Sequence, residues 1–336
     1  MNFRPAPAPL SVTAAGDAPT QAWAASVGRR FTGPVAIDDQ TFYGAGVDRK
    51  VYAVELSSGI TRWSSRLSGI IAGGLLVSGD TVYAATSRPQ GRVFALDRLT
   101  GRRYWQSSTG LVGAPLAIWK GVLIAPTQRG ELLGLDAASG AIKWRRRVGV
   151  ARVAAVPADS VSVMVATVDS LFVVGVADGK VSHRARSPGT VLSPWIPLHG
   201  LLVAGTTDSL VIAVRADDVS VEWRVNLDAP VLASPAAMGD TIYAATRRGT
   251  LYRIVADSAP RAQPVVALDW PITAPVTIVD GQILLGGADG AIRALTPAGE
   301  ERWRVQLWRP VELGPIALSD GILAVGGDGD LHRFRR

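Results

Sequence analysis

Short apolar runs separated by glycine and polar turns recur along nearly the whole chain. The repeating unit is clearest from 113 to 148, where four such runs follow one another at 114–118, 121–125, 131–136 and 141–148. Runs of this length, rich in aliphatic residues and bounded by turn formers, are typical of β-strands. No helical periodicity competes with them. The pattern predicts units of four short strands that repeat about every forty residues.

Tryptophan marks one position in successive units. The gaps between the marked positions are 40, 42, 39, 79 and 80 residues, and halving the last two predicts lost copies near His183 and Gln263. Proline recurs with the same step at a second position, so two residue types share one register. A repeat of this period predicts stacked structural units. The repeat tryptophans are Trp23, Trp63, Trp105, Trp144, Trp223 and Trp303.

A turn motif precedes several of these tryptophans. It runs from Asp97 to Gly101 before Trp105, and from Asp136 to Gly140 before Trp144. The Asp side chain can accept hydrogen bonds from turn N–H groups, and glycine allows a positive φ. Tryptophan four residues later is wide enough to pack between neighbouring units. We therefore assign these residues a structural role.

Counting the units predicts the architecture. Seven full units run from about 33 to 307, the C-terminus adds three strands, and the N-terminus adds one isolated strand at 22–27. The two fragments make one further unit. We predict an all-β, eight-bladed β-propeller of four-stranded antiparallel blades over 22–336, closed by the N-terminal strand joining the C-terminal blade. Residues 1–21, rich in Pro and Ala, are predicted to be a flexible tether.

The Asp-x-x-Thr-Gly-x-x-x-Trp motif resembles the repeat of the PQQ-like (quinoprotein-type) β-propellers. Within that group, the stretch 18–28, the blade order and the terminal closure are most similar to the outer-membrane protein assembly factor family BamB. The resemblance implies a non-enzymatic, monomeric scaffold in the periplasm that supports assembly of β-barrel outer-membrane proteins. It also implies a protein partner, the POTRA domains of a BamA-type barrel insertase.

The resemblance points to one connection as a contact region. BamB proteins bind their partner through a loop after the third full blade that carries a Leu-x-Leu-Arg-like sequence. The matching loop is 149–153, with Val150 and Arg152, so the arginine is kept and the leucines are not. A second BamB contact, Asp-x-Asp, matches 231–235, which contains no acid.

Charge predicts a second feature of the surface. Lys and Arg number 35 against 28 Asp and Glu, giving a net charge of +7. The loops between second and third strands, and the connections between blades, should share one face. We predict that this face is basic over the first three blades and acidic over the later ones, and such a polarised face would favour oriented docking. Ordinary solvated loops are the alternative. The basic members of this face are Arg29, Arg30, Arg49, Lys50, Arg88, Arg92, Arg129, Arg152, Arg247, Arg248 and Arg309, and the acidic ones are Asp169, Asp208, Asp289, Asp328 and Asp330.

Two tryptophans outside the repeat register fall on connections of that same face. Trp270 and Trp308, the latter followed by Arg309, combine the residue types most enriched at binding hot spots. The alternative is that each caps a groove between blades. We predict that the partner-binding residues include Val150, Arg152, Arg247, Arg248, Trp270, Trp308 and Arg309.

Residues for catalysis are scarce. The chain has no cysteine and three histidines, and it lacks phosphate-binding, nucleophile-elbow, zinc-protease and EF-hand motifs. The doublet at 38–39 falls at a turn, where acids are expected. We predict no catalytic, cofactor or metal site, no enzyme activity and no nucleic-acid partner. An extracytoplasmic sensor or ligand-binding propeller remains the alternative, with a quinoprotein dehydrogenase behind it.

Targeting signals are also missing from the sequence. Residues 1–20 lack the apolar core of a signal peptide, and no run reaches the length of a membrane span. A periplasmic, outer-membrane-associated protein would therefore need a signal and a lipidated cysteine that this chain does not contain. We expect membrane association only through such an N-terminal anchor.

Overall fold

The computed structural model describes residues 11–14, 18–28, 30–257, 259–272, 274–311, 313–326 and 328–335. Within these ranges the regular elements are all β-strands. The chain divides into two compact units. Unit I comprises 28–191 and 215–220, and unit II comprises the described parts of 1–27, 192–214 and 221–336. Blades are numbered 1 to 8 in chain order, and each unit is described on its own.

Unit I holds blades 1 to 4, each an antiparallel sheet whose strands follow one another in sequence. The strands are β3 (Ala36–Ile37), β4 (Thr41–Ala45), β5 (Lys50–Glu55) and β6 (Thr61–Arg66) in blade 1, β7 (Ile71–Ser78), β8 (Thr81–Thr86), β9 (Arg92–Asp97) and β10 (Arg103–Ser108) in blade 2, β11 (Ala117–Trp119), β12 (Val122–Pro126), β13 (Glu131–Asp136) and β14 (Ile142–Arg147) in blade 3, and β15 (Val156–Pro157), β16 (Ser162–Ala166), β17 (Ser170–Gly175) and β18 (Val181–Arg186) in blade 4.

Unit II holds the strands of blades 5 to 8, apart from the last residue of β21. They are β19 (Ile196–Leu198), β20 (Leu201–Gly205), β21 (Leu210–Arg215) and β22 (Val221–Asn226) in blade 5, β23 (Ala236–Met238), β24 (Thr241–Ala245), β25 (Thr250–Val255) and β26 (Ala262–Ala267) in blade 6, β27 (Thr277–Val279), β28 (Gln282–Gly286), β29 (Ala291–Leu295), β30 (Glu301–Gln306) and the added β1 (Ser11–Ala14) in blade 7, and β31 (Ile316–Leu318), β32 (Gly321–Val325), β33 (Asp330–Arg335) and β2 (Thr20–Ser26) in blade 8.

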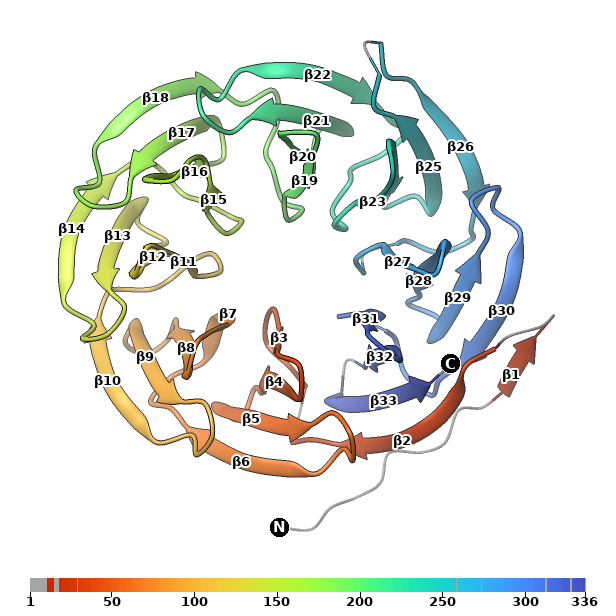
Figure 1. Cartoon of the computed structure of the whole chain (residues 1–336), viewed down its shortest axis with the longest axis horizontal. Coiled ribbons are helices and arrows are strands. Elements are labelled where there is room, and N and C mark those ends of the chain that lie inside the picture. Colours follow the sequence, from red (N-terminus) through yellow and green to blue (C-terminus); the bar gives the residue numbers. More distant parts are fainter. Residues whose placement is uncertain are drawn as a thin grey trace. The chain divides into compact units, whose positions relative to one another are not determined.

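Burial explains the sequence pattern of each blade. Within a blade the first strand lies at one edge and the fourth at the other (Figure 1). The second strand β12 is buried along its whole length, whereas the fourth strand β14 exposes most of its residues. A strand covered on both faces needs a continuous apolar run, and an edge strand does not. The predicted fold class, an eight-bladed β-propeller of four-stranded antiparallel blades, is confirmed.

Blade 8 is built from both ends of the chain. The N-terminal strand β2 pairs antiparallel with β33, from Thr20 opposite Arg335 to Ser26 opposite Asp330. The Ser26 hydroxyl also donates a hydrogen bond of 2.5 Å to the Asp330 carboxylate. The two segments appear side by side in Figure 1, red against blue. The predicted closure by the N-terminal strand is therefore confirmed.

A further strand lies within the predicted tether. Residues 11–14 form β1, which pairs antiparallel with β30 and makes blade 7 five-stranded. Strand β2 begins at Thr20, before the predicted start of the propeller at 22. Residues 1–10 and 15–17 lie outside the described part, so the division into a tether and a propeller stays a prediction.

The repeat tryptophans of unit I join each blade to the next, as predicted. The indole Nε1 of Trp63 donates to the carbonyl oxygen of Arg98 at 2.9 Å, and that of Trp105 donates to Ala137 at 3.1 Å. Trp144 donates to Val176 at 2.7 Å. Each acceptor belongs to the turn before the fourth strand of the following blade. A buried indole N–H is satisfied in this way while the ring fills the space between blades.

The turn glycine makes room for the ring. A Cβ on Gly101 would lie 2.5 Å from Trp63, and one on Gly140 would lie 2.4 Å from Trp105. Both glycines also have a positive φ, of 70° and 74°. Neither position can take a side chain without moving the tryptophan or straining the backbone.

The aspartate of the motif holds the same turn together. Asp97 accepts hydrogen bonds from the N–H groups of Leu99 and Thr100, from the Thr100 hydroxyl and from Tyr104. The Tyr104 and Thr100 contacts lower the pKa of Asp97 to about 2. Such a bonded carboxylate favours its ionised form, so the turn is most stable with Asp97 charged.

The repeat weakens where the sequence predicts lost copies. His183 stands opposite Val173, and Gln263 opposite Arg253, in the register that Trp63 occupies opposite Ala53. In unit II the Trp303 indole donates to the side chain of Gln282 in its own blade rather than to another turn. Trp223 packs with Ala256 in an apolar cluster, and Trp23 pairs with Arg333 in blade 8.

Candidate functional site

The connection between β14 and β15 holds Val150 and Arg152 of unit I. Its backbone is fixed, because Ala151 forms a bridge with Thr167 and the Val168 N–H donates to the Val150 carbonyl at 3.1 Å. The Arg152 side chain is exposed, and Val150 is half-buried. Among the described residues Arg152 has no ion-pair partner. A fixed backbone with a free guanidinium suits recognition of an acceptor on a partner.

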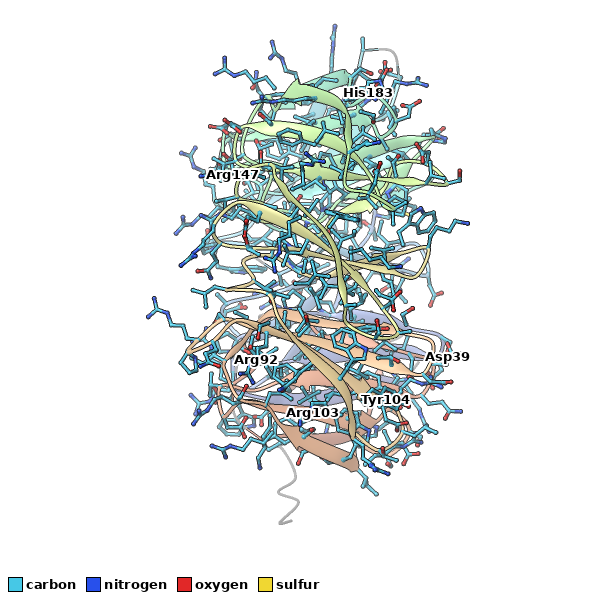
Figure 2. All side chains as sticks on the ribbon, turned by 90° about the vertical axis from the view of Figure 1, so that its left-hand side faces the viewer. Asp39, Arg92, Arg103, Tyr104, Arg147 and His183 are labelled. Atoms are coloured by element: carbon cyan, nitrogen blue, oxygen red, sulfur yellow. The ribbon has the colours of Figure 1, made fainter. Side chains whose placement is uncertain are left out.

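We call the side of unit I that carries this connection the loop face. It also includes the hairpins between second and third strands, and the opposite turn face carries the turns before second and fourth strands. Figure 2 views unit I edge-on, with Arg92 and Arg147 on the loop face and Asp39 and Tyr104 on the other side. In blades 1 to 3 the loop face carries exposed arginines such as Arg49 and Arg129, and in blade 4 it carries the exposed Asp169. Arg29 of the predicted set lies outside the described residues.

In unit II, Arg247 and Arg248 sit at the tip of the hairpin between β24 and β25. Both side chains are exposed, and the Arg247 N–H donates to the Pro230 carbonyl at 2.8 Å. Gly249 of the same hairpin lies against the carbonyl of Trp270 on the next connection. The structure thus brings this arginine pair close to the connection that carries Trp270.

Trp308 and Arg309 follow β30 on another connection of unit II. The Trp308 side chain is 55% exposed. Arg309 forms an ion pair of 2.8 Å with Asp328, which the sequence analysis placed among the acidic members of the face. Arg309 and Asp328 therefore compensate each other locally, and the Trp308 side chain beside Arg309 is exposed.

Trp270 has a structural role in unit II. It is half-buried in an apolar cluster, and the Arg293 guanidinium stacks on its ring at 4.9 Å from the centroid. Arg293 is itself buried and pairs with Asp289 at 2.5 Å. Burial acts to raise the pKa of Asp289, but the hydrogen bonds and charge of Arg293, together with the Ala291 N–H, outweigh burial and lower it. Only part of Trp270 is left for a partner.

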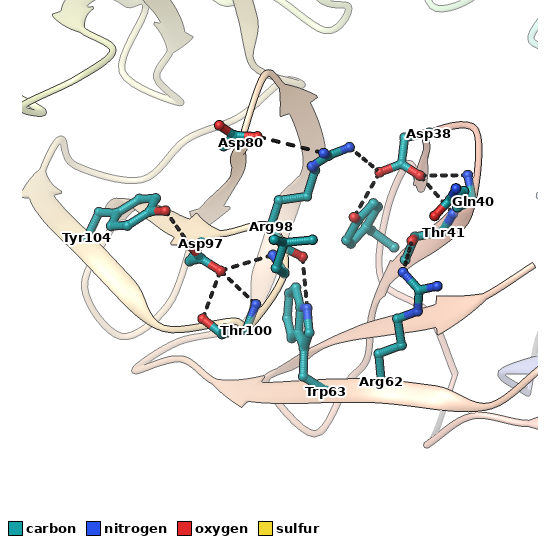
Figure 3. A network of polar contacts seen from close by, with 12 residues as sticks. Asp38, Gln40, Thr41, Arg62, Trp63, Asp80, Asp97, Arg98, Thr100 and Tyr104 are labelled. Atoms are coloured by element: carbon teal, nitrogen blue, oxygen red, sulfur yellow. Dashed lines mark hydrogen bonds and ion pairs between the residues drawn. The ribbon is translucent and has the colours of Figure 1, made fainter.

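A polar network on the turn face of unit I was missed by the sequence analysis. Asp38 accepts hydrogen bonds from the Tyr43 hydroxyl at 3.0 Å and from Arg98 at 3.1 Å, and Arg98 also reaches Asp80 at 3.7 Å (Figure 3). Arg98 belongs to blade 2 and Asp38 to blade 1. The sequence signal was the acidic doublet at 38–39, which was interpreted only as a turn.

The network lines a cavity of 240 Å³ between blades 1 and 2, together with Gln40, Thr41, Arg62 and Leu99. Burial raises the pKa of Tyr43 to about 12, and its bond to Asp38 acts in the same direction. Burial would raise the pKa of Asp38 too, but bonds from Gln40, Tyr43, Thr41 and Arg98 lower it. Each charged side chain of the network is paired with an opposite charge or a hydrogen-bond donor. This arrangement is typical of a structural contact between two blades rather than of a catalytic group.

No cluster of three or more His, Asp or Glu side chains in the described ranges is arranged to hold a metal ion. The same ranges contain no helix with the length and apolarity needed to cross a membrane.

The family of the chain follows from comparison with known proteins. The family model described as "Outer membrane protein assembly factor BamB" matches residues 11–155 and 149–267. The chain belongs to the BamB family. The BamB of Bordetella pertussis is 23% identical over 347 residues, covering 95% of this chain and 88% of that protein. The BamB of Pseudomonas aeruginosa is 32% identical over 178 residues, covering 48% of this chain and 46% of its own length.

Solved structures show the fold of the BamB family in this chain. The crystal structure of BamB from Moraxella catarrhalis superposes with a TM-score of 0.82 at 16% sequence identity, covering 95% of this chain and all of that one. A computationally designed protein, Ika8, has a TM-score of 0.72 at 13% identity and 93% coverage of this chain. The predicted resemblance to BamB is confirmed by sequence and structure together.

Proposed function

We propose that this chain is a non-enzymatic, BamB-like scaffold that supports assembly of β-barrel proteins in the outer membrane. The observation that carries the proposal is the BamB family match, together with eight blades that superpose on a BamB structure. A scaffold needs a rigid frame and exposed recognition groups, and the tryptophan-linked blades and arginine-bearing loops supply both. The place of action is the periplasm, next to the outer membrane, and the protein works as a monomer.

The proposed partner is the POTRA region of a BamA-type barrel insertase. On unit I the contact is the connection with Val150 and Arg152, where the backbone is held by blade 4. On unit II it includes Trp308, Arg309, Arg247, Arg248 and the exposed part of Trp270. Aromatic and arginine side chains are the most frequent hot-spot residues of protein interfaces. The absent leucines at 149–153 predict that unit I contributes through Arg152 more than through apolar contact.

Photo-crosslinking in the source cell envelope tests the proposal. A photoreactive residue replaces Trp308 or Arg152, one variant for each unit. Matched probes replace Val255 in unit II and Ile60 in unit I, which are also exposed but lie at turns before fourth strands. Crosslinked products are identified by mass spectrometry.

Crosslinks from Trp308 or Arg152 to a POTRA-bearing barrel protein, absent from Val255 and Ile60, are the expected result. Equal labelling from both kinds of probe, or a different specific partner, would overturn the proposed partner. Specific capture of a sensor kinase or another signalling protein would favour the extracytoplasmic sensor in its place.

A further inference from the structure

Arginine occupies one register position in three of the four blades of unit I. The last residue of the fourth strand is Arg66 opposite Lys50, Arg147 opposite Glu131 and Arg186 opposite Ser170, and it is Ser108 only in blade 2. In unit II the same position holds no charge. There it is occupied by Asn226, Ala267, Gln306 and Ser26. Since the position is equivalent in every blade, the charge distinguishes unit I.

These arginines have no counter-charge in the part of the chain that the structure describes. Arg66, Arg147 and Arg186 are exposed and form no ion pair with a described residue. The same holds for Arg49 and Arg129 at hairpin tips of the loop face. In unit II, Arg309 and Arg293 are each paired with an aspartate, whereas Arg247 and Arg248 at a hairpin tip form no ion pair with a described residue. Unpaired like charges repel one another in the free protein, and an anionic surface relieves that repulsion.

The acids of unit I gather mainly on its other side. Asp38, Asp97, Asp136 and Asp178 all belong to the turn face, and each is engaged by N–H groups or a cation there. The loop face also carries acids: Asp48 is held by the Tyr52 hydroxyl at 2.5 Å, Glu131 stands opposite Arg147, and Asp169 is exposed on the hairpin between β16 and β17. Figure 2 shows the two sides, with Arg92 and Arg147 opposite Asp39 and Tyr104. Unit I therefore presents its excess positive charge in one direction.

Aliphatic side chains stand singly among these arginines. Val47, Ile70 and Val168 are 45%, 42% and 43% exposed, and they lie on three different loops of the loop face. A protein interface gathers its apolar groups into a core from which charges are depleted. Here the charges extend over blades 1, 3 and 4, and no apolar core separates them. A plane of phosphate groups above a hydrocarbon layer matches both features better than a folded partner does.

We propose that the loop face of unit I docks onto an anionic phospholipid membrane surface. The guanidinium groups of Arg66, Arg147 and Arg186 donate hydrogen bonds to headgroup phosphate oxygens, to which arginine can bind with two N–H groups at once. Val47, Ile70 and Val168 reach the boundary between headgroups and acyl chains. This inference goes beyond the proposed function, since it concerns lipid. Because Val150 and Arg152 lie on the same face, it requires that the membrane and a protein partner bind unit I there at different times.

Vesicle cosedimentation of the full chain tests the proposal. The vesicles are a mixture of phosphatidylglycerol and phosphatidylcholine, or phosphatidylcholine alone, at low and at high salt. The test variant is R66S/R147S/R186S. The matched control is R102S/R103S/K180S, which removes the same charge from exposed positions of unit I away from the loop face. Val150 and Arg152 stay unchanged in both, so the proposed protein contact is not altered.

We expect the wild type to bind the phosphatidylglycerol mixture and to lose binding at high salt, because the attraction is screened. The test variant should bind at least about tenfold more weakly, and the control should bind like the wild type. Equal thermal unfolding midpoints of the two variants and the wild type show that both variants fold. If the triple variant does not fold, the single variants R66S and R147S replace it, each with a smaller expected loss of vesicle binding.

Three results would overturn the proposal. The first is a wild type that does not bind the phosphatidylglycerol mixture even at low salt. The second is an equal loss in the test and control variants, which would mean attraction by net charge alone. The third is a test variant that binds lipid like the wild type but no longer captures an acidic protein that the wild type captures from the envelope. This result would assign the loop face to protein recognition.

Discussion

The turns before the fourth strands are built differently in two regions of the molecule. In blades 2 and 3, an aspartate holds the turn, a glycine opens space, and the tryptophan of the preceding blade fills that space and donates to a turn carbonyl. In the turn at 215–220, Val219 takes the glycine position, since its N–H donates to Arg215 as that of Gly140 does to Asp136. The preceding blade there has His183 in place of tryptophan.

At this turn the loss of the tryptophan is accompanied by the loss of the glycine. Val219 has a positive φ of 58° and is fully buried, which a bulky indole in the same space would not permit. Without the ring, this turn has room for the Val219 side chain, and burial of that side chain offsets the backbone strain. At this turn the two positions therefore act as one contact between blades.

The largest expected effect comes from filling the glycine space. Gly140→Ala should destabilise the chain by about 2–4 kcal/mol, because the new methyl group meets the Trp105 ring and the residue must keep a positive φ. The measurement is the urea unfolding midpoint.

Gly121→Ala is the matched control for this substitution. Gly121 has a φ of 73°, close to the 74° of Gly140, but a Cβ there would meet no atom within 4 Å. It should cost only about 1–2 kcal/mol, the cost of the backbone alone. Equal losses in the two variants would mean that the indole contact contributes nothing to the glycine requirement.

A smaller effect should come from rebuilding the motif at the weakened turn. His183→Trp alone should destabilise by about 1–2 kcal/mol, because the introduced ring overpacks against Val219. Combining it with Val219→Gly should recover most of that loss, giving a coupling energy of about 1 kcal/mol in a double-mutant cycle. Strictly additive effects would contradict the idea that the two positions share one space.

The smallest expected effect is on the free energy of unfolding at acidic pH. Hydrogen bonds from Lys143 and Ser139 lower the pKa of Asp136 to about 2. Because the folded-state pKa is depressed, the carboxylate stabilises the fold above its ordinary value of 3.8 and loses that contribution as pH falls towards 2.

The replacement Asp136→Asn should flatten the pH dependence of the unfolding midpoint between about pH 4 and pH 2. Asp257→Asn, at the turn of blade 6, is the comparison, because Asp257 makes one backbone contact with Ala259 and no ion pair within the described part. An equal change in both variants would show that the aspartate of the motif contributes no more to the pH dependence of stability than another turn aspartate does.

Much of the architecture could be predicted because it depends on local chemistry. The number of residues between Trp105 and Trp144 gives the length of one blade. The three strands after residue 313 form an incomplete blade, and the segment 22–27 supplies its fourth strand. Even the lost copies were placed correctly, at His183 and Gln263. These features need only strand periodicity and turn residues, both of which are visible along the chain.

Contacts between blades could not be predicted in the same way. The bond from Arg98 to Asp38 joins positions sixty residues apart, and it depends on how two sheets pack. The same is true of Trp270, whose ring is covered by Arg293, and of Trp303, which donates to Gln282 instead of a turn. The partner residues Val150, Arg152, Arg247, Arg248, Trp308 and Arg309 lie on loops and connections, as predicted, but their role in binding stays a prediction.

The blade assembled from both ends has a consequence for the time course of folding. Strand β2 is among the first segments to be synthesised, yet its partner β33 arrives 304 residues later, at the separation of Ser26 from Asp330. Until then β2 offers an unpaired backbone edge to any strand it meets. Because such a long-range pairing is slow to form, a newly synthesised chain should need protection of this edge from other strands. Loss of β33 would leave the edge of β2 permanently unpaired and prone to aggregation.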